Sequence, residues 1–220
     1  KASARRGRSN GAAVQTFLVA SASPGDGKTL LTANLALAAA RKGRTVLAID
    51  ADFGNQRLAE ILRPDGPDGP GITEVVETGL NLAEATRPLG PSGTLDLLSR
   101  GLRPATAPDF FSLPATKAFI EKVGEHYDIV LIDGPPMLHV AYASALARYV
   151  DRVVVVVRHD SSVKQVEDLA QRLDLIGTPI AGYVYNAAPL QYSMTLTGGS
   201  LHDVLGDVAP TDAEDAKIES

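Results

Sequence analysis

The chain has 220 residues, of which 45% are hydrophobic and 21% charged, a composition that suits a folded globular protein and excludes a disordered or collagen-like chain. It has no cysteine, which excludes disulfide scaffolds, thiolate metal sites and cysteine nucleophiles, and no uncharged apolar run of eighteen residues. The net charge of −5 and the absence of tryptophan disfavour a general nucleic-acid-binding protein.

The N-terminal residues differ in charge from the rest. Residues 1–8 hold four basic side chains, so the remainder of the chain sums to −9. We interpret residues 1–13 as a basic linker, with contact to DNA or to an anionic membrane as the alternative. Because the chain starts with Lys1 and shows no signal-peptide pattern, we expect it to be part of a longer protein.

Short apolar runs, rich in β-branched residues, recur along the chain and predict strands. They lie at residues 16–20, 45–50, 128–133, 153–158 and 180–186, with a weaker candidate at residues 95–98. Several are apolar on both faces, which is typical of buried parallel strands.

The stretches between these runs have apolar residues at the spacing of an α-helix. Leu31, Leu35 and Ala38 are spaced to share one helix face, and Gly43 marks the end of that helix. A second stripe comprises Val166, Leu169, Leu173 and Ile176 and ends before Gly177. The alternation predicts an α/β fold: a doubly wound, mostly parallel sheet with helices on both faces.

The domain boundaries follow from this alternation. Residues 14–190 are expected to form one phosphate-binding-loop (P-loop) domain, with turn-rich loops at residues 63–71 and 104–108. The remaining residues 191–220 are rich in Gly, Thr and Asp and are predicted to be a flexible tail.

The strongest motif is SASPGDGKT, which ends at Thr29 between a strand and an Ala/Leu-rich helix. Gly25 and Gly27 allow the backbone to curl, so that its N–H groups point at phosphate oxygens. Lys28 can reach the β- and γ-phosphates, and Thr29 can offer its hydroxyl to Mg²⁺. The first position of the formal motif is Ala22 instead of glycine. The context nevertheless predicts a P-loop.

Three aspartates stand at the ends of two expected strands. Asp133 ends one strand and is followed by Gly-Pro-Pro, and Asp50 and Asp52 end another. The carboxyl ends of parallel strands meet at the ligand-binding edge of a sheet, and clustered carboxylates there favour a shared cation. We predict that Asp133 and Asp50 serve Mg²⁺ and that Asp52 accepts a proton from the attacking group.

SASPGDGKT, VLAIDAD and DIVLIDGPP together resemble the P-loop and acidic motifs of the bacterial tyrosine kinases of capsule and exopolysaccharide systems. GITEVV, LDLLSRG, PATAPDFF and AGYVYN resemble further segments of that family in the same order, so the likeness covers residues 14–190. The similar positioning ATPases of chromosomes and septa carry an extra lysine early in the loop, and this chain does not.

The resemblance implies a set of site residues. The catalytic residues would be Lys28, Asp50, Asp52 and Asp133. Contacts to ATP would come from Ser23, Pro24, Gly25, Asp26, Gly27, Lys28, Thr29, Leu30 and Asn186. Contacts to Mg²⁺ would come from Thr29, Asp50 and Asp133.

The resemblance also implies an oligomeric state, a partner and a cellular location. Members of that family form rings, phosphorylate tyrosines at their own C-terminus and work with a membrane co-polymerase or activator, fused or separate. We therefore expect a homo-oligomer in the cytoplasm, at the inner face of the cell membrane, with no nucleic-acid partner.

Three departures from the family pattern leave the activity open between an ATPase and a tyrosine-kinase-like phosphotransferase. Residues 53–56 read FGNQ, closer to the positioning ATPases, Tyr142 stands where the family has aspartate, and Tyr192 is the last tyrosine. The alternatives are a nucleotide-switched assembly module without kinase activity and a positioning-type ATPase. The internal tyrosines are expected to be poorly accessible, namely Tyr127, Tyr142, Tyr149, Tyr183 and Tyr185.

Overall fold

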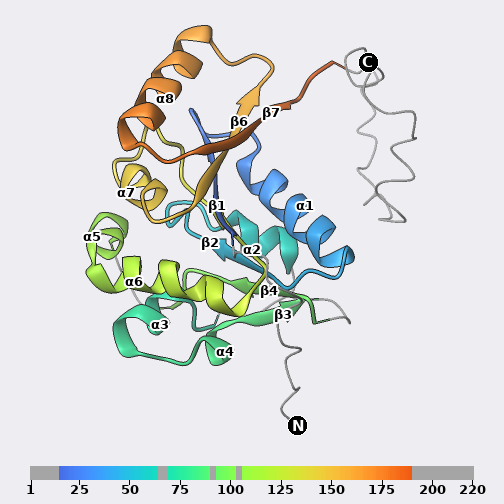
Figure 1. Ribbon diagram of the computed structural model, residues 1–220, viewed down its shortest axis with the longest axis vertical. Coiled ribbons are helices and arrows are strands. Elements are labelled where there is room, and N and C mark those ends of the chain that lie inside the picture. The colour runs from blue at the N-terminus through green and yellow to red at the C-terminus, as the bar shows by residue number, and fades with distance from the viewer. Residues whose placement is uncertain (1–14, 64–68, 90–92, 103–105, 190–220) are drawn as a thin grey trace, which may run out of the picture. The chain divides into compact units, whose positions relative to one another are not determined.

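The computed structural model describes residues 15–63, 69–89, 93–102 and 106–189 (Figure 1). The described residues up to Asn186 belong to one compact unit. The predicted linker and tail lie outside the described residues.

The described residues form one seven-stranded sheet in the order β3-β4-β2-β5-β1-β6-β7. All neighbouring strands are parallel except β3, which runs antiparallel to β4 at the edge. The bounds are β1 Gln15–Ser21, β2 Val46–Asp50, β3 Arg87–Leu89, β4 Leu95–Leu98, β5 Ile129–Asp133, β6 Arg152–Arg158 and β7 Ile180–Asn186. The predicted doubly wound, mostly parallel sheet is confirmed, including its weakest candidate strand.

Helices cover both faces of this sheet (Figure 1). Their bounds are α1 Lys28–Arg41, α2 Arg57–Leu62, α3 Ile72–Thr78, α4 Leu82–Ala85, α5 Ala107–Ser112, α6 Pro114–Val123, α7 Ala143–Ala147 and α8 Val163–Ile176, with a 3₁₀ turn η1 at Gly124–His126. The short helices between residues 57 and 123 had no clear sequence signal, and α5 begins inside the loop predicted at residues 104–108.

Alternate strand residues divide the core into two layers. In β2, Leu47 and Ile49 pack with α3 and α5 to α8, whereas Val46 and Ala48 pack with α1 and α2. This two-sided burial explains why the central strands are apolar throughout.

The buried face of α1 differs from the predicted stripe. Ala38 is exposed, and the helix buries Thr32, Ala33 and Ala36 against the sheet instead. Leucine and alanine occur on every face of this helix, so the spacing of apolar residues could not identify the face that packs on the sheet. The stripe predicted for α8 is confirmed: Leu169 and Leu173 are buried, and the helix ends at Gly177.

The expectation of poorly accessible tyrosines is wrong for Tyr183 and Tyr185, which are 60% and 54% exposed on the edge strand β7. Along β7 half-buried and exposed positions alternate, and both tyrosines lie on the exposed face of the strand. Tyr127 and Tyr142 are buried as expected. Within the described ranges, no helix has both the length and the apolar character needed to cross a membrane.

Candidate functional site

The loop between β1 and α1 has the backbone conformation of a phosphate-binding loop. Gly25 and Gly27 have φ angles of +83° and +100°, in the left-handed region that side chains with a Cβ rarely adopt. Gly27 caps the N-terminus of α1, where the helix dipole favours an anion. The glycines of the motif are therefore required by the shape of the loop.

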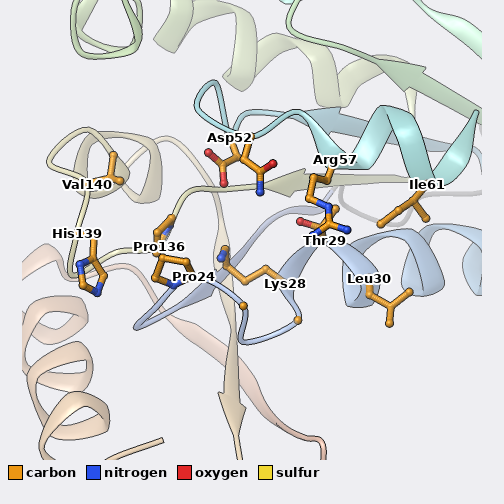
Figure 2. A pocket seen from close by; sticks show the side chains of 13 residues that line it. Pro24, Lys28, Thr29, Leu30, Asp52, Arg57, Ile61, Pro136, His139 and Val140 are labelled. Atoms are coloured by element: carbon orange, nitrogen blue, oxygen red, sulfur yellow. The ribbon is translucent and has the colours of Figure 1, made fainter. Parts of the chain in front are cut away.

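A cavity of about 570 Å³ opens beside this loop (Figure 2). Lys28 and Thr29 line it from the start of α1, and Asp52 faces them from the segment after β2 (Figure 2). Lys28 is only 6% exposed, so its ammonium group is held in the cavity wall. The cavity thus brings the Lys28 ammonium, the Thr29 hydroxyl and the Asp52 carboxylate together at the carboxyl edge of the sheet.

Asp50 lies directly beside Asp133 in the β2–β5 register, and both side chains are fully buried. Oδ2 of Asp50 accepts hydrogen bonds from the backbone N–H groups of Leu58 and Ala59, at 3.2 and 3.3 Å, and so caps α2. Oδ1 has no partner. Burial, followed by repulsion from Asp133, raises the pKa of Asp50 to about 8.

Asp133 is tied to α1 through a threonine. Its Oδ1 accepts a hydrogen bond from the Thr32 hydroxyl at 3.4 Å. Oδ2 has no partner. Burial raises the pKa of Asp133 to about 6, although Thr29 and the positive charge of Lys28 oppose the shift.

Asp52 is half-buried and faces the cavity. Burial raises the pKa of this carboxyl, while the charge of Lys28 and the backbone N–H groups of Gly54 and Asn55 lower it. It is the most accessible of the three aspartates and the one best placed to contact a group that enters the cavity.

These groups fit a nucleotide-bound magnesium ion. A buried carboxylate oxygen without a partner is costly, and two of them next to the loop are suited to a cation or to water molecules around it. Within the described ranges, no three His, Cys, Asp or Glu side chains are grouped to hold a metal by themselves. An ion here would therefore need oxygens from a ligand as well, as Mg²⁺ bound with a nucleotide has.

The remaining predicted residues divide into two groups. Pro24, Gly25, Gly27 and Leu30 line the cavity, and Leu30 is 54% exposed. The others contact the loop itself: Asp26 accepts a hydrogen bond from the Ser23 backbone, and Asn186 donates to the Asp26 carbonyl oxygen.

Sequence reasoning missed six of the residues that line the cavity, among them Arg57 and His139. Arg57 begins α2 and His139 follows the Gly-Pro-Pro turn, and both line the cavity (Figure 2). The side chain of Arg57 makes no hydrogen bond or ion pair with any part of the chain that the structure describes. Neither residue belongs to a motif that the sequence analysis singled out.

Comparison with known proteins agrees with this geometry. Residues 17–211 match the family described as the CobQ/CobB/MinD/ParA nucleotide binding domain. The tyrosine-protein kinase ptk of Acinetobacter johnsonii is 30% identical over 164 residues, which are 74% of this chain and 22% of that protein. The chain thus spans about a fifth of the length of this curated relative.

Two solved structures extend the comparison. The kinase domain of the Escherichia coli tyrosine kinase ETK is 28% identical, with a TM-score of 0.71 over 78% of this chain and 67% of that one. The MinD cell division protein of Aquifex aeolicus is 24% identical, with a TM-score of 0.65 over 86% and 76%. The second likeness concerns the fold alone.

Proposed function

The chain belongs to the CobQ/CobB/MinD/ParA nucleotide-binding family, and from this premise we propose that it binds Mg-ATP at the P-loop and transfers the terminal phosphoryl group. The predicted resemblance to the bacterial tyrosine kinases is confirmed. The observation that carries the proposal is the pair of unpartnered, buried oxygens on Asp50 and Asp133 beside a P-loop lysine.

Binding would rest on the loop and the first turn of α1. The loop N–H groups and Lys28 hold the phosphates, and Thr29 and Asp133 hold the metal, with Asp50 behind them. When bound, Mg²⁺ would neutralise charge on the phosphate oxygens. Asp50 also fixes the start of α2 through its second oxygen, which keeps Arg57 at the cavity.

Asp52 would orient or deprotonate the nucleophile. Its raised pKa makes it a better proton acceptor than an ordinary aspartate, and it stands across the cavity from Lys28. Residues 193–220 contain no tyrosine, so we expect the nucleophile to be water or a tyrosine outside that segment. Slow ATP hydrolysis and weak autophosphorylation should follow for this chain alone.

The test of binding is calorimetric titration with Mg-ATP of the wild type and of Lys28→Met. Loss of the cation that faces the phosphates should weaken binding at least tenfold, about 1.4 kcal/mol. Lys42→Met, at the exposed end of the same helix, is the matched control and should bind like the wild type. Unchanged affinity in Lys28→Met would overturn the P-loop assignment.

A nucleotide-switched assembly module is the second candidate, favoured by the FGNQ segment at residues 53–56. In that case ATP would bind and change the oligomeric state without turnover. Release of ADP and phosphotyrosine mass spectrometry, after incubation with Mg-ATP, separate the two. Nucleotide-dependent oligomerisation with neither product would favour the module.

The biological setting follows from the relatives. We infer that the chain is the cytoplasmic kinase-like part of a system for capsule or exopolysaccharide export, and that it assembles with copies of itself and with a membrane co-polymerase or activator. Co-purification of the full-length protein with a membrane partner, lost on deletion of residues 14–190, is the test.

A further inference from the structure

Two carbonyl oxygens of the P-loop are held by side chains from the far end of the sequence. Arg158, at the end of β6, donates from Nη1 to the carbonyl oxygen of Gly25 at 3.2 Å. Asn186, at the end of β7, donates from Nδ2 to the carbonyl oxygen of Asp26 at 2.8 Å. Both contacts depend on the placement of β6 beside β1 and of β7 beside β6.

Asn186 fits closely against the loop. A Cβ added to Gly27 would clash with Nδ2 of Asn186. Gly27 therefore serves two purposes, since its φ of +100° shapes the loop and its bare Cα leaves room for the amide.

The two side chains are themselves held in place. Nε of Arg158 donates to Oδ1 of Asp160 at 2.8 Å, and the backbone N–H of His159 donates to the carbonyl oxygen of Asn186 at 2.9 Å. The ends of β6 and β7 thus form one connected support for the loop.

The contacts have a consequence for phosphate binding. In a trans peptide the C=O and N–H groups point in opposite directions. A side chain that holds the carbonyl of Gly25 outward therefore turns the N–H of Asp26 inward, and one that holds the carbonyl of Asp26 turns the N–H of Gly27 inward. Inward N–H groups are what a P-loop offers to phosphate.

We propose that Asn186 and Arg158 are positioning residues, which set the affinity of the P-loop for phosphate from the β6–β7 edge of the sheet. The inference rests on the proposed nucleotide site and gives Asn186 a role beyond that of an expected ATP contact.

The experiment compares Mg-ATP, Mg-GTP and inorganic tripolyphosphate as ligands of the wild type and of Asn186→Ala by calorimetry. If Asn186 positions the loop, the variant should bind all three about fivefold more weakly, the effect of one lost hydrogen bond. Unchanged affinity for tripolyphosphate, with weaker binding of the nucleotides alone, would mean that Asn186 acts on the base and not on the loop, and would overturn the proposal.

Arg158→Ala should behave like Asn186→Ala, and Arg152→Ala is the matched control. Arg152 is an exposed arginine at the opposite end of β6, so its loss should leave all three affinities unchanged. Equal loss in Arg152→Ala would mean that β6 is merely destabilised.

A second measurement needs no ligand. Amide hydrogen exchange of residues 22–27 should speed up several-fold in Asn186→Ala and Arg158→Ala but not in Arg152→Ala.

A double variant gives a further check. Gly27→Ala should weaken tripolyphosphate binding less in the Asn186→Ala background than in the wild type, because the atom nearest to the new methyl group is gone. If the wild type binds no ligand, the proposed function fails. If loop exchange is also unchanged in the variants, the positioning role fails separately.

Discussion

The two sides of the P-loop are built in opposite ways. On the side of β2 and β5, Asp50 and Asp133 are fully buried, and each has a carboxylate oxygen without a partner. On the side of β6 and β7, Arg158 and Asn186 are not buried, and each makes a hydrogen bond to the loop backbone.

The contrast separates two tasks that one site must perform. Buried polar groups left without partners destabilise the protein by itself and are tolerated where a ligand supplies the missing charge. Groups that are already satisfied lower the cost of ordering the loop before a ligand arrives. We therefore expect changes on the β2–β5 side to affect chemistry and metal dependence, and changes on the β6–β7 side to affect affinity.

The largest expected effect is on turnover. Asp52→Asn should still bind Mg-ATP within about twofold but lose roughly 100-fold in ADP release, because an amide cannot accept a proton. Asp168→Asn, on the exposed face of α8, is the control and should turn over normally. Normal turnover in Asp52→Asn would break the assignment of chemistry to the β2–β5 side.

The second largest expected effect is on the Mg²⁺ dependence of ATP affinity. Asp133→Asn should weaken the dependence of ATP affinity on Mg²⁺ by about tenfold, since a neutral amide replaces a buried anion near the metal. Asp50→Asn should act in the same direction but more mildly. Titrations with ATP at several Mg²⁺ concentrations test both variants. If the ATP affinity of the wild type does not depend on Mg²⁺, the assignment of Asp50 and Asp133 to the metal is wrong.

The metal-free protein should lose stability as pH rises from 5 to 8. The pKa values of Asp50 and Asp133 are raised to about 8 and about 6 in the folded state, so the folded state binds more protons than the unfolded one in this window. Their contribution is complete below pH 4 and is lost as pH passes through the raised values. Thermal midpoints across this range should show a shallower slope for Asp50→Asn, and an unchanged slope would contradict the buried-charge interpretation.

The smallest effect tests the β6–β7 side. The Thr178 hydroxyl, just before β7, donates to the carbonyl oxygen of Ala147 at 2.7 Å, so Thr178→Val should lower the free energy of unfolding by about 1 kcal/mol. ATP affinity should not change, because neither residue contacts the loop. A weaker affinity, measured beside a urea unfolding curve, would mean that general destabilisation of this side is enough to loosen the P-loop.

The sequence alone determined six of the seven strands of the described sheet, the P-loop and the three aspartates, but not the edge strand β3. These features depend on local patterns: apolar runs of strand length, glycines at left-handed positions, and acids at strand ends that a parallel sheet brings to one edge. The Asp50–Asp133 register pair is a direct result of that topology. Neither the buried face of α1 nor the helices between residues 57 and 123 had such a pattern.

Only the tertiary structure decided how the site is supported and what else enters it. The hydrogen bonds from Arg158 and Asn186 to the loop join residues 133 and 160 positions apart, and no local pattern encodes such a separation. The same holds for Arg57 and His139 at the cavity and for the exposure of Tyr183 and Tyr185 on β7. Burial and partners are properties of packing, which the chain acquires only when strands distant in sequence become neighbours.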